Sequence, residues 1–214
     1  MASPAATHPA KLLRSLVRSP AVLAIIAVLV AVFAAQAVSA DVAEQLALPG
    51  DTADLADRPW SPLTVMFLHE NVLHLLVMVL MLAAFGMLLE QATSAGHVLA
   101  VYLLAGLAGS LAVLAALAVV EADGTLVGAS AAVLGVAAAV LALRPSDRVL
   151  GGTATQWFSV LVAVNIVFLL SQPLGSVAHL TGLAVGAAYG RRLGGRVRAE
   201  SGEFVVPGTT DSPD

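Results

Sequence analysis

The sequence predicts an all-α membrane protein with six transmembrane helices. Of its 214 residues, 59% are hydrophobic and only 11% are charged, whereas about a quarter of the residues in an ordinary soluble domain are charged. Apolar segments close to the roughly 20 residues needed to cross a bilayer recur along the chain. An alternating strand pattern is absent, and only a helix satisfies its own backbone groups within lipid, so each segment is expected to be helical.

Six spans are predicted in chain order. They cover residues 21–40, 71–89, 98–120, 128–143, 155–171 and 176–193. The first follows Lys11, Arg14 and Arg18 and ends in VSA, so a cleaved signal peptide is an alternative interpretation. Its 20 apolar residues exceed the roughly 7–15 of a signal-peptide core, which favours a retained helix. The predicted parts are a basic cytoplasmic segment (1–20), a six-helix membrane domain (21–193) and a disordered cytoplasmic tail (194–214).

The basic residues predict how the chain is oriented. Three of the ten precede the first span, two lie between the fourth and fifth, and four lie at or after the end of the sixth, which places nine on one side. Only Arg58 falls on the other side, which also carries an acidic first loop. Because basic loops face the cytoplasm, both termini are predicted to be cytoplasmic and the protein to lie in the cell (inner) membrane. The bilayer is the expected surrounding, and no nucleic-acid partner is expected.

Few polar side chains fall inside the predicted spans, and three of them share one depth. Ionisable groups within spans are costly and are therefore functional candidates. His74, Ser130 and His179 each lie in the first turns of a span that enters from the external side. The fourth span has only 16 residues, roughly 24 Å against a core of about 30 Å, so its start can lie where water reaches it. Gln36 and Asn165 also lie inside spans, without a predicted role.

Glycines mark the face of the sixth span that carries its histidine. His179, Gly182, Gly186 and Gly190 follow at i, i+3, i+7 and i+11, on one side of a helix. Small residues let helix backbones approach closely, so the imidazole can reach Ser130 if the fourth span is the neighbour. A serine hydroxyl becomes a nucleophile when an adjacent base, usually histidine, removes its proton. The alternative is that Ser130 only packs or caps its helix.

The segment FLHENVLH suggests a weaker, alternative interpretation as a zinc site. It resembles the zinc motif HExxH, but His69 and His74 are five residues apart, about 140° around a helix rather than on one face. The chain has no cysteine, which excludes disulfides and thiolate metal sites. No metal site and no cofactor are therefore expected.

Four segments occur in an order that matches a known family. They are PWSPLT with FLHENVLHLL, then FGMLLE, LVGASAAVLG and AHLTGLAVGAAYG. The first pair resembles the end of loop one and the start of helix two, and FGMLLE resembles the end of that helix. LVGASAAVLG is similar to a GxSG element, and the last segment to an AHxxGxxxG element. Over about residues 58–192 the chain resembles the rhomboid family of intramembrane serine proteases.

This resemblance implies a function and a set of site residues. It implies hydrolysis of peptide bonds in or near transmembrane segments of protein substrates, with Ser130 as nucleophile and His179 as general base. His74 and the Ser130 backbone N–H would bind the oxyanion. The absence of an intramembrane carboxylate fits a dyad rather than a triad. The motif glycines are Gly128, Gly182 and Gly186.

Several positions depart from the family pattern. Met78 stands one turn after His74 where the family usually has Asn, and a thioether cannot donate a hydrogen bond. Asn71, one turn before His74, is a candidate replacement donor. Ala131 replaces the second glycine of GxSG, Leu134 a frequent aromatic residue and Ser61 a frequent arginine.

These departures keep a second interpretation open. Loss of one oxyanion donor typically costs about 10²–10³ in rate. The alternative function is therefore that of a catalytically impaired rhomboid-like pseudoprotease, which binds or escorts membrane proteins. A transporter is a third interpretation, but it would favour intramembrane charges or broken helices in repeated halves, and neither pattern is clear here.

Overall fold

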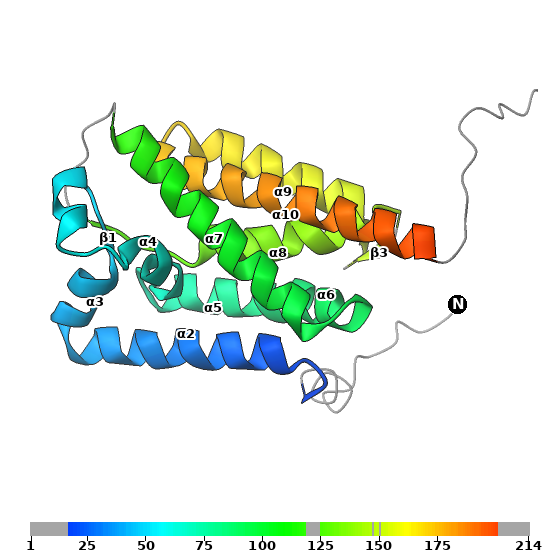
Figure 1. Ribbon diagram of the computed structural model, residues 1–214, viewed down its shortest axis with the longest axis horizontal. Helices are drawn as coiled ribbons and strands as arrows, with labels where there is room; N and C mark the ends of the chain where they lie inside the picture. Colours follow the sequence, from blue (N-terminus) through cyan, green and yellow to red (C-terminus); the bar gives the residue numbers. More distant parts are fainter. Residues whose placement is uncertain (1–16, 119–124, 147, 150, 201–214) are drawn as a thin grey trace, which may run out of the picture.

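Long helices form a bundle in which α7 crosses obliquely over the others (Figure 1). The computed structural model describes residues 17–118, 125–146, 148–149 and 151–200. Within this part, three helical stretches are long and apolar enough to cross a membrane: α2 (Pro20–Val38), the stretch Val72–Ala92, and α7 (Ala95–Leu117). The shorter helices α8 (Ser130–Leu143) and α9 (Ala154–Phe168) and the long α10 (Pro173–Glu200) complete the bundle. The predicted all-α, polytopic membrane fold is confirmed.

Each predicted span corresponds to helix, with differences at the ends. The second span is not one regular helix, because a π-helical turn (η3, Leu82–Gly86) separates α5 (Val72–Met81) from α6 (Met87–Ala92). The sixth begins earlier than predicted, at Pro173, since proline at the first helical position has no N–H to satisfy. It also continues to residue 200, into the predicted tail.

Some predictions fall on residues that the structure does not describe. These are the basic segment before residue 17, residues 119–120 at the end of the third predicted span, and the tail from residue 201. The acidic residues Glu121 and Asp123, which the predicted spans place on the external side, also lie outside the described residues.

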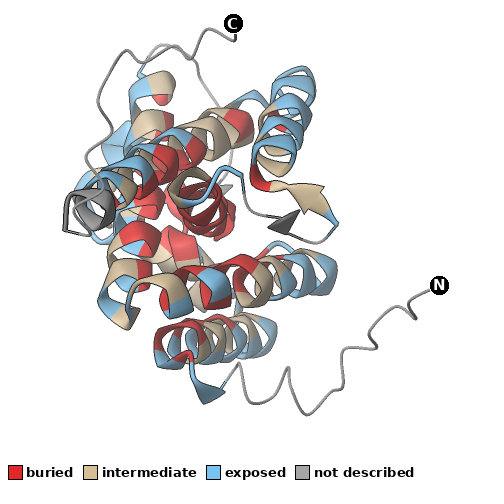
Figure 2. Ribbon diagram, turned by 90° about the vertical axis from the view of Figure 1, so that its right-hand side faces the viewer, coloured by how far each residue is buried: buried red, intermediate tan, exposed pale blue. Residues whose placement is uncertain are grey.

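Helix α8 forms the centre of the bundle. Every residue from Ser130 to Leu141 is buried, and Figure 2 shows the buried residues gathered inside a layer of more exposed helices. Helix α10 packs against α8 along the predicted glycine face. A Cβ at Gly182, Gly186 or Gly190 would lie 2.0–2.2 Å from a carbonyl oxygen of α8. The two backbones are therefore in direct contact, as the small residues predict.

Residues 39–67 form a structured loop at one end of the bundle, here called the loop end. It contains α3 (Ala40–Leu46), β1 (Leu48–Pro49), η1 (Thr52–Ala56), α4 (Ser61–Thr64) and η2 (Val65–Phe67). Strand β1 pairs antiparallel with β2 (Thr125–Leu126), which places the loop beside the segment that leads into Ser130. A second short pair, β3 (Arg148–Val149) with β4 (Gly152–Thr153), precedes α9.

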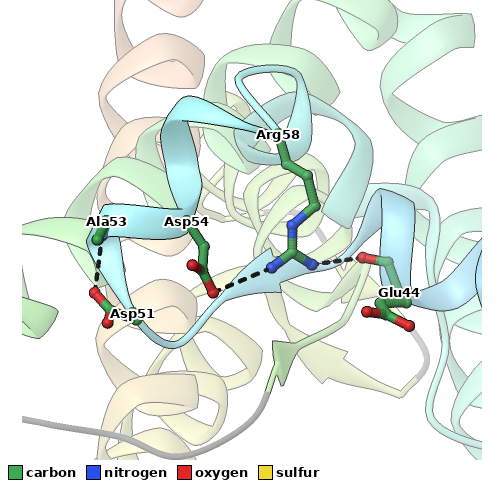
Figure 3. Close-up of polar contacts among 5 residues, drawn as sticks. All are labelled: Glu44, Asp51, Ala53, Asp54 and Arg58. Atoms are coloured by element: carbon green, nitrogen blue, oxygen red, sulfur yellow. Dashed lines mark hydrogen bonds and ion pairs between the residues drawn. The ribbon is translucent and has the colours of Figure 1, made fainter.

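The one basic residue predicted on the external side stabilises this loop. Arg58 donates a hydrogen bond to the Glu44 carbonyl at 2.7 Å and lies 3.7 Å from the Asp54 carboxylate (Figure 3). The Asp51 carboxylate accepts a bond from the Ala53 N–H at 2.8 Å. The exception to the basic-residue pattern therefore has a local structural use.

A buried carboxylate ties α2 to the bundle. The two oxygens of Glu90, on α6, accept bonds from the Ala21 and Val22 N–H groups, both at 3.0 Å. These are first-turn N–H groups of α2, where a negative charge is favoured. The contact joins the start of α2 to the end of α6.

Candidate active site

Ser130 and His179 meet near the loop end. The Ser130 Oγ lies 2.5 Å from the His179 Nε2, although the two residues are 49 positions apart in the chain. Ser130 is the first residue of α8, and His179 lies in α10 on the glycine face that packs against α8. The serine is 9% exposed. The predicted dyad is thus in hydrogen-bonding geometry.

Gly128 shapes the backbone that delivers the serine. Its φ of +148° is a conformation that residues with a Cβ rarely adopt. A Cβ at this position would also lie 3.4 Å from both the His74 ring and the Ser130 Oγ. The Gly128 N–H donates to the Val65 carbonyl at 3.4 Å. A glycine here leaves space between the serine and the histidine of α5.

A third side chain contacts the dyad histidine. The Asn165 Oδ1, on α9, lies 2.6 Å from the His179 Nδ1, and the Asn165 Nδ2 donates to the Leu161 carbonyl at 2.8 Å. The sequence prediction did not include this residue in the site. A polar residue in the middle of an otherwise apolar span was the available signal, but its partner depends on how α9 and α10 are rotated against each other.

His74 lies at the same site as the dyad. It lines the cavity that holds Ser130 and His179, and its Nδ1 is buried without a hydrogen-bond partner among the described residues. The His69 ring packs against it, with centroids 5.4 Å apart. The Gln36 amide exchanges two bonds of 3.2 Å with the His69 backbone, which fixes this segment to α2. Burial, together with the nearby His74, lowers the pKa of His69 to about 4.

The site opens into a cavity of about 590 Å³. Its walls come from α7, α10 and the segments around β1 and β2. The polar lining residues are Glu70, His74, Ser110, Ser130, Gln172 and His179. Glu70 and Gln172 were not predicted, because both lie in segments between helices, outside the predicted spans. The cavity is large enough for several substrate side chains and water beside the serine.

Asn71 is not among the residues that line this cavity. Its side chain is the N-cap of α5 and accepts a bond from the His74 N–H at 2.9 Å. An asparagine directly before an apolar helix is a strong capping signal, so this use was readable from the sequence. Met78, at the position where the family usually has Asn, is buried in the core and does not line the cavity either. The cavity geometry therefore does not support Asn71 as the oxyanion donor that replaces the missing amide at position 78.

The extra methyl group of Ala131 is accommodated by a glycine of the neighbouring helix. A Cβ added to Gly109, on α7, would lie only 2.7 Å from the Ala131 Cβ. The missing side chain on α7 thus provides the space that the family's second glycine would otherwise leave. Ala131 does not displace Ser130 from His179.

Comparison with known proteins defines the family. A family model described as Rhomboid domain matches residues 56–196, about two thirds of the chain. The chain belongs to the rhomboid family. No curated protein matches it. The rhomboid family includes intramembrane serine proteases and inactive pseudoproteases, so family membership places the chain in the membrane while leaving two functions to compare.

Proposed function

We propose that this rhomboid is a serine endopeptidase that cleaves transmembrane segments of other membrane proteins. The observation that carries the proposal is the 2.5 Å contact between the Ser130 Oγ and the His179 Nε2 at the wall of a cavity. The basic-residue pattern supports an orientation in which this cavity faces outward and both termini are cytoplasmic. The partners are then transmembrane substrates, cut near their outer ends.

The first half of the reaction forms an acyl-enzyme. The Ser130 Oγ attacks the carbonyl carbon of the scissile bond while its proton moves to the His179 Nε2, and the carbonyl electrons pass to the oxygen. The tetrahedral intermediate then collapses. The carbon–nitrogen bond breaks, and the leaving nitrogen takes the proton from His179.

The second half releases the acyl group. A water molecule in the cavity gives a proton to the His179 Nε2 and attacks the ester carbonyl. The bond to the Ser130 Oγ breaks, and that oxygen recovers the proton. No group outside the chain and water is needed.

Two donors lie where they could stabilise the oxyanion. The Ser130 N–H is at the first position of a 14-residue helix, where an N–H has no intrahelical partner and the helix dipole favours negative charge. The His74 ring and the Ser130 Oγ each lie 3.4 Å from the position that a Cβ would take at Gly128. A preorganised donor of this kind is typically worth about 10²–10³ in rate.

Cleavage of a reporter transmembrane protein in liposomes tests the proposal. Ser130→Ala and His179→Ala should each lower the cleavage rate by at least about 10²-fold, since the general base and nucleophile act as one unit. Ser110→Ala is the matched control, because Ser110 also lines the cavity but its hydroxyl donates to the Gly106 carbonyl at 3.1 Å. The control should cleave like the parent. Cleavage by Ser130→Ala at the parental rate would disprove the proposal.

Met78 favours a second candidate function. The oxyanion position that the family usually fills with an amide holds a buried thioether here, which fits a rhomboid pseudoprotease that binds membrane proteins without cutting them. Met78→Asn separates the two functions. A large gain in cleavage would mean that the oxyanion site of the parent is incomplete. Labelling of the parent by a fluorophosphonate, dependent on Ser130 and His179, would contradict the pseudoprotease.

A further inference from the structure

We infer that Asn165 is a positioning residue that fixes the proton of His179 on Nδ1 and leaves Nε2 free to accept the Ser130 proton. The effect of Asn165 on the reaction rests on the proposed protease function, whereas the tautomer of the His179 imidazole does not depend on it. Of the 15 residues of α9, only Ala154 and Asn165 are buried, and Asn165 is 4% exposed.

A buried amide on such an exposed helix needs partners on both its atoms. Most of α9 presents apolar side chains outward, among them Val160, Val164 and Ile166. Packing alone would therefore favour another aliphatic residue at position 165. Burial of an amide without hydrogen bonds is costly, and both polar atoms of Asn165 are bonded, one within α9 and one to α10.

The donor and acceptor roles follow from one carbonyl group. The Leu161 carbonyl can only accept a hydrogen bond, so the atom of Asn165 at 2.8 Å from it must be the amide nitrogen. The other atom, 2.6 Å from the His179 Nδ1, is then the amide oxygen. An amide oxygen also only accepts, so Nδ1 carries the hydrogen.

This tautomer is the one that the proposed mechanism needs. A neutral imidazole has one N–H and one lone pair, so a hydrogen on Nδ1 leaves the lone pair on Nε2. Nε2 is the atom that lies 2.5 Å from the Ser130 Oγ. The three side chains therefore form a directed chain, in which Ser130 donates to His179 and His179 donates to Asn165. An amide supplies this orientation without placing a charge in the membrane.

Nitrogen NMR of the whole chain, labelled with ¹⁵N-histidine in lipid nanodiscs, measures the tautomer directly. The His179 signals are assigned by their loss in His179→Ala. The parent should show the Nδ1–H tautomer. Asn165→Leu, which removes the acceptor at similar size, should populate the Nε2–H form. Asn165→Asp should retain the Nδ1–H form, because a carboxyl oxygen accepts whether the group is ionised or protonated.

The activity arm uses the same variants. Asn165→Leu should lower kcat of reporter cleavage by about 10- to 100-fold with KM little changed, the range typical of removing the hydrogen-bond partner of a metal-ligating histidine. Asn165→Asp should recover most of this loss. Ser159→Ala is the matched control, since Ser159 is exposed on the same helix and donates to the Thr155 carbonyl at 3.0 Å. It should change neither readout.

The outcomes separate this inference from the proposed function. If the parent neither cleaves nor reacts with a fluorophosphonate, the protease proposal fails while the tautomer measurement still decides the role of Asn165. An Nε2–H tautomer in the parent overturns the inference, even where Asn165→Leu fails to fold. An unchanged tautomer and kcat in a folded Asn165→Leu overturn it as well.

Discussion

Helices α8 and α9 differ sharply in how they are held, although both contribute to the same site. In α8 every residue from Ser130 to Leu141 is buried, and its carbonyls touch the glycine face of α10. In α9 only two residues are buried, and one of them is the polar Asn165. The proposed nucleophile and base therefore lie on two helices whose backbones are in direct contact and cannot move closer together. The residue that orients the base comes instead from a helix attached mainly at its inner face.

This difference separates two requirements of the site. The distance between Ser130 and His179 is set by packing, because any displacement of α10 toward α8 would force backbone atoms together. The tautomer that we infer for His179 depends instead on one hydrogen bond to Asn165 on α9. A substitution on the α8–α10 contact should therefore act on folding, whereas one at Asn165 should act on chemistry.

The largest expected effect tests the backbone contact. Gly186→Val should prevent stable folding, at a cost of about 3 kcal/mol or more, because its Cβ would lie 2.0 Å from the Gly135 carbonyl oxygen and backbone atoms cannot move aside. Gly195→Val on the same helix is the control, since nothing lies within 4 Å of a Cβ there. Thermal unfolding in detergent measures both. Equal unfolding temperatures for the two variants would refute the tight contact.

A smaller effect is expected where α7 meets α8. Gly109→Ala would bring its Cβ within 2.7 Å of the Ala131 Cβ and 3.1 Å of the Ala178 carbonyl oxygen, and should cost about 1–3 kcal/mol. Adding Ala131→Gly to the same chain should recover part of this loss, because only the first contact is relieved. The unfolding free energies of the single and double variants form the cycle. Strict additivity would mean that the two residues do not share the space.

Low pH tests the contribution of His69, which packs against His74 beside the site. Its effect on stability is expected to be smaller than that of the glycine substitutions. With the pKa of His69 lowered to about 4, the folded chain keeps this ring neutral where the unfolded chain protonates it. Stability from this residue should be complete above pH 6.5 and decline as the pH falls from 6.5 to 4. His69→Phe should reduce the decline, since neither ring nitrogen has a hydrogen-bond partner among the described residues. A parallel pH dependence of parental and variant unfolding temperatures would contradict this.

The smallest effect is expected on the outer face of α9. Val164 is 45% exposed, so Val164→Ala should change the unfolding free energy by less than about 0.5 kcal/mol. The same substitution at Val133, which is 1% exposed on α8, should leave a cavity and cost about 1 kcal/mol or more. A reversed order in thermal unfolding would show that α9 is packed more firmly than its exposure indicates.

Much of the architecture could be predicted because its signals are local. Hydrophobic length marks each span, and the spacing from His179 to Gly190 marks the face of one helix. The alignment of Ser130 with His179 followed from their depths, since alternate spans enter from the same side. These inferences needed no knowledge of how one helix is rotated against another.

The remainder depends on neighbours that the sequence does not order. Asn165 was visible as a polar residue in a span, but its contact with His179 needs the rotation of α9 about its own axis. The space that Gly109 leaves for Ala131 likewise depends on how α7 and α8 cross. The use of Asn71 was different, because its position before an apolar helix already indicated a cap.

The position of the proposed base on the last span has a consequence for biosynthesis. A chain is synthesised from its N-terminus, so α8 with Ser130 emerges before α9 and α10. Until α10 is inserted, the serine has no histidine beside it and α8 lacks the surface that buries it. The nascent chain therefore holds the hydroxyl without the proposed base, and the proposed dyad is complete only when α10 is in place.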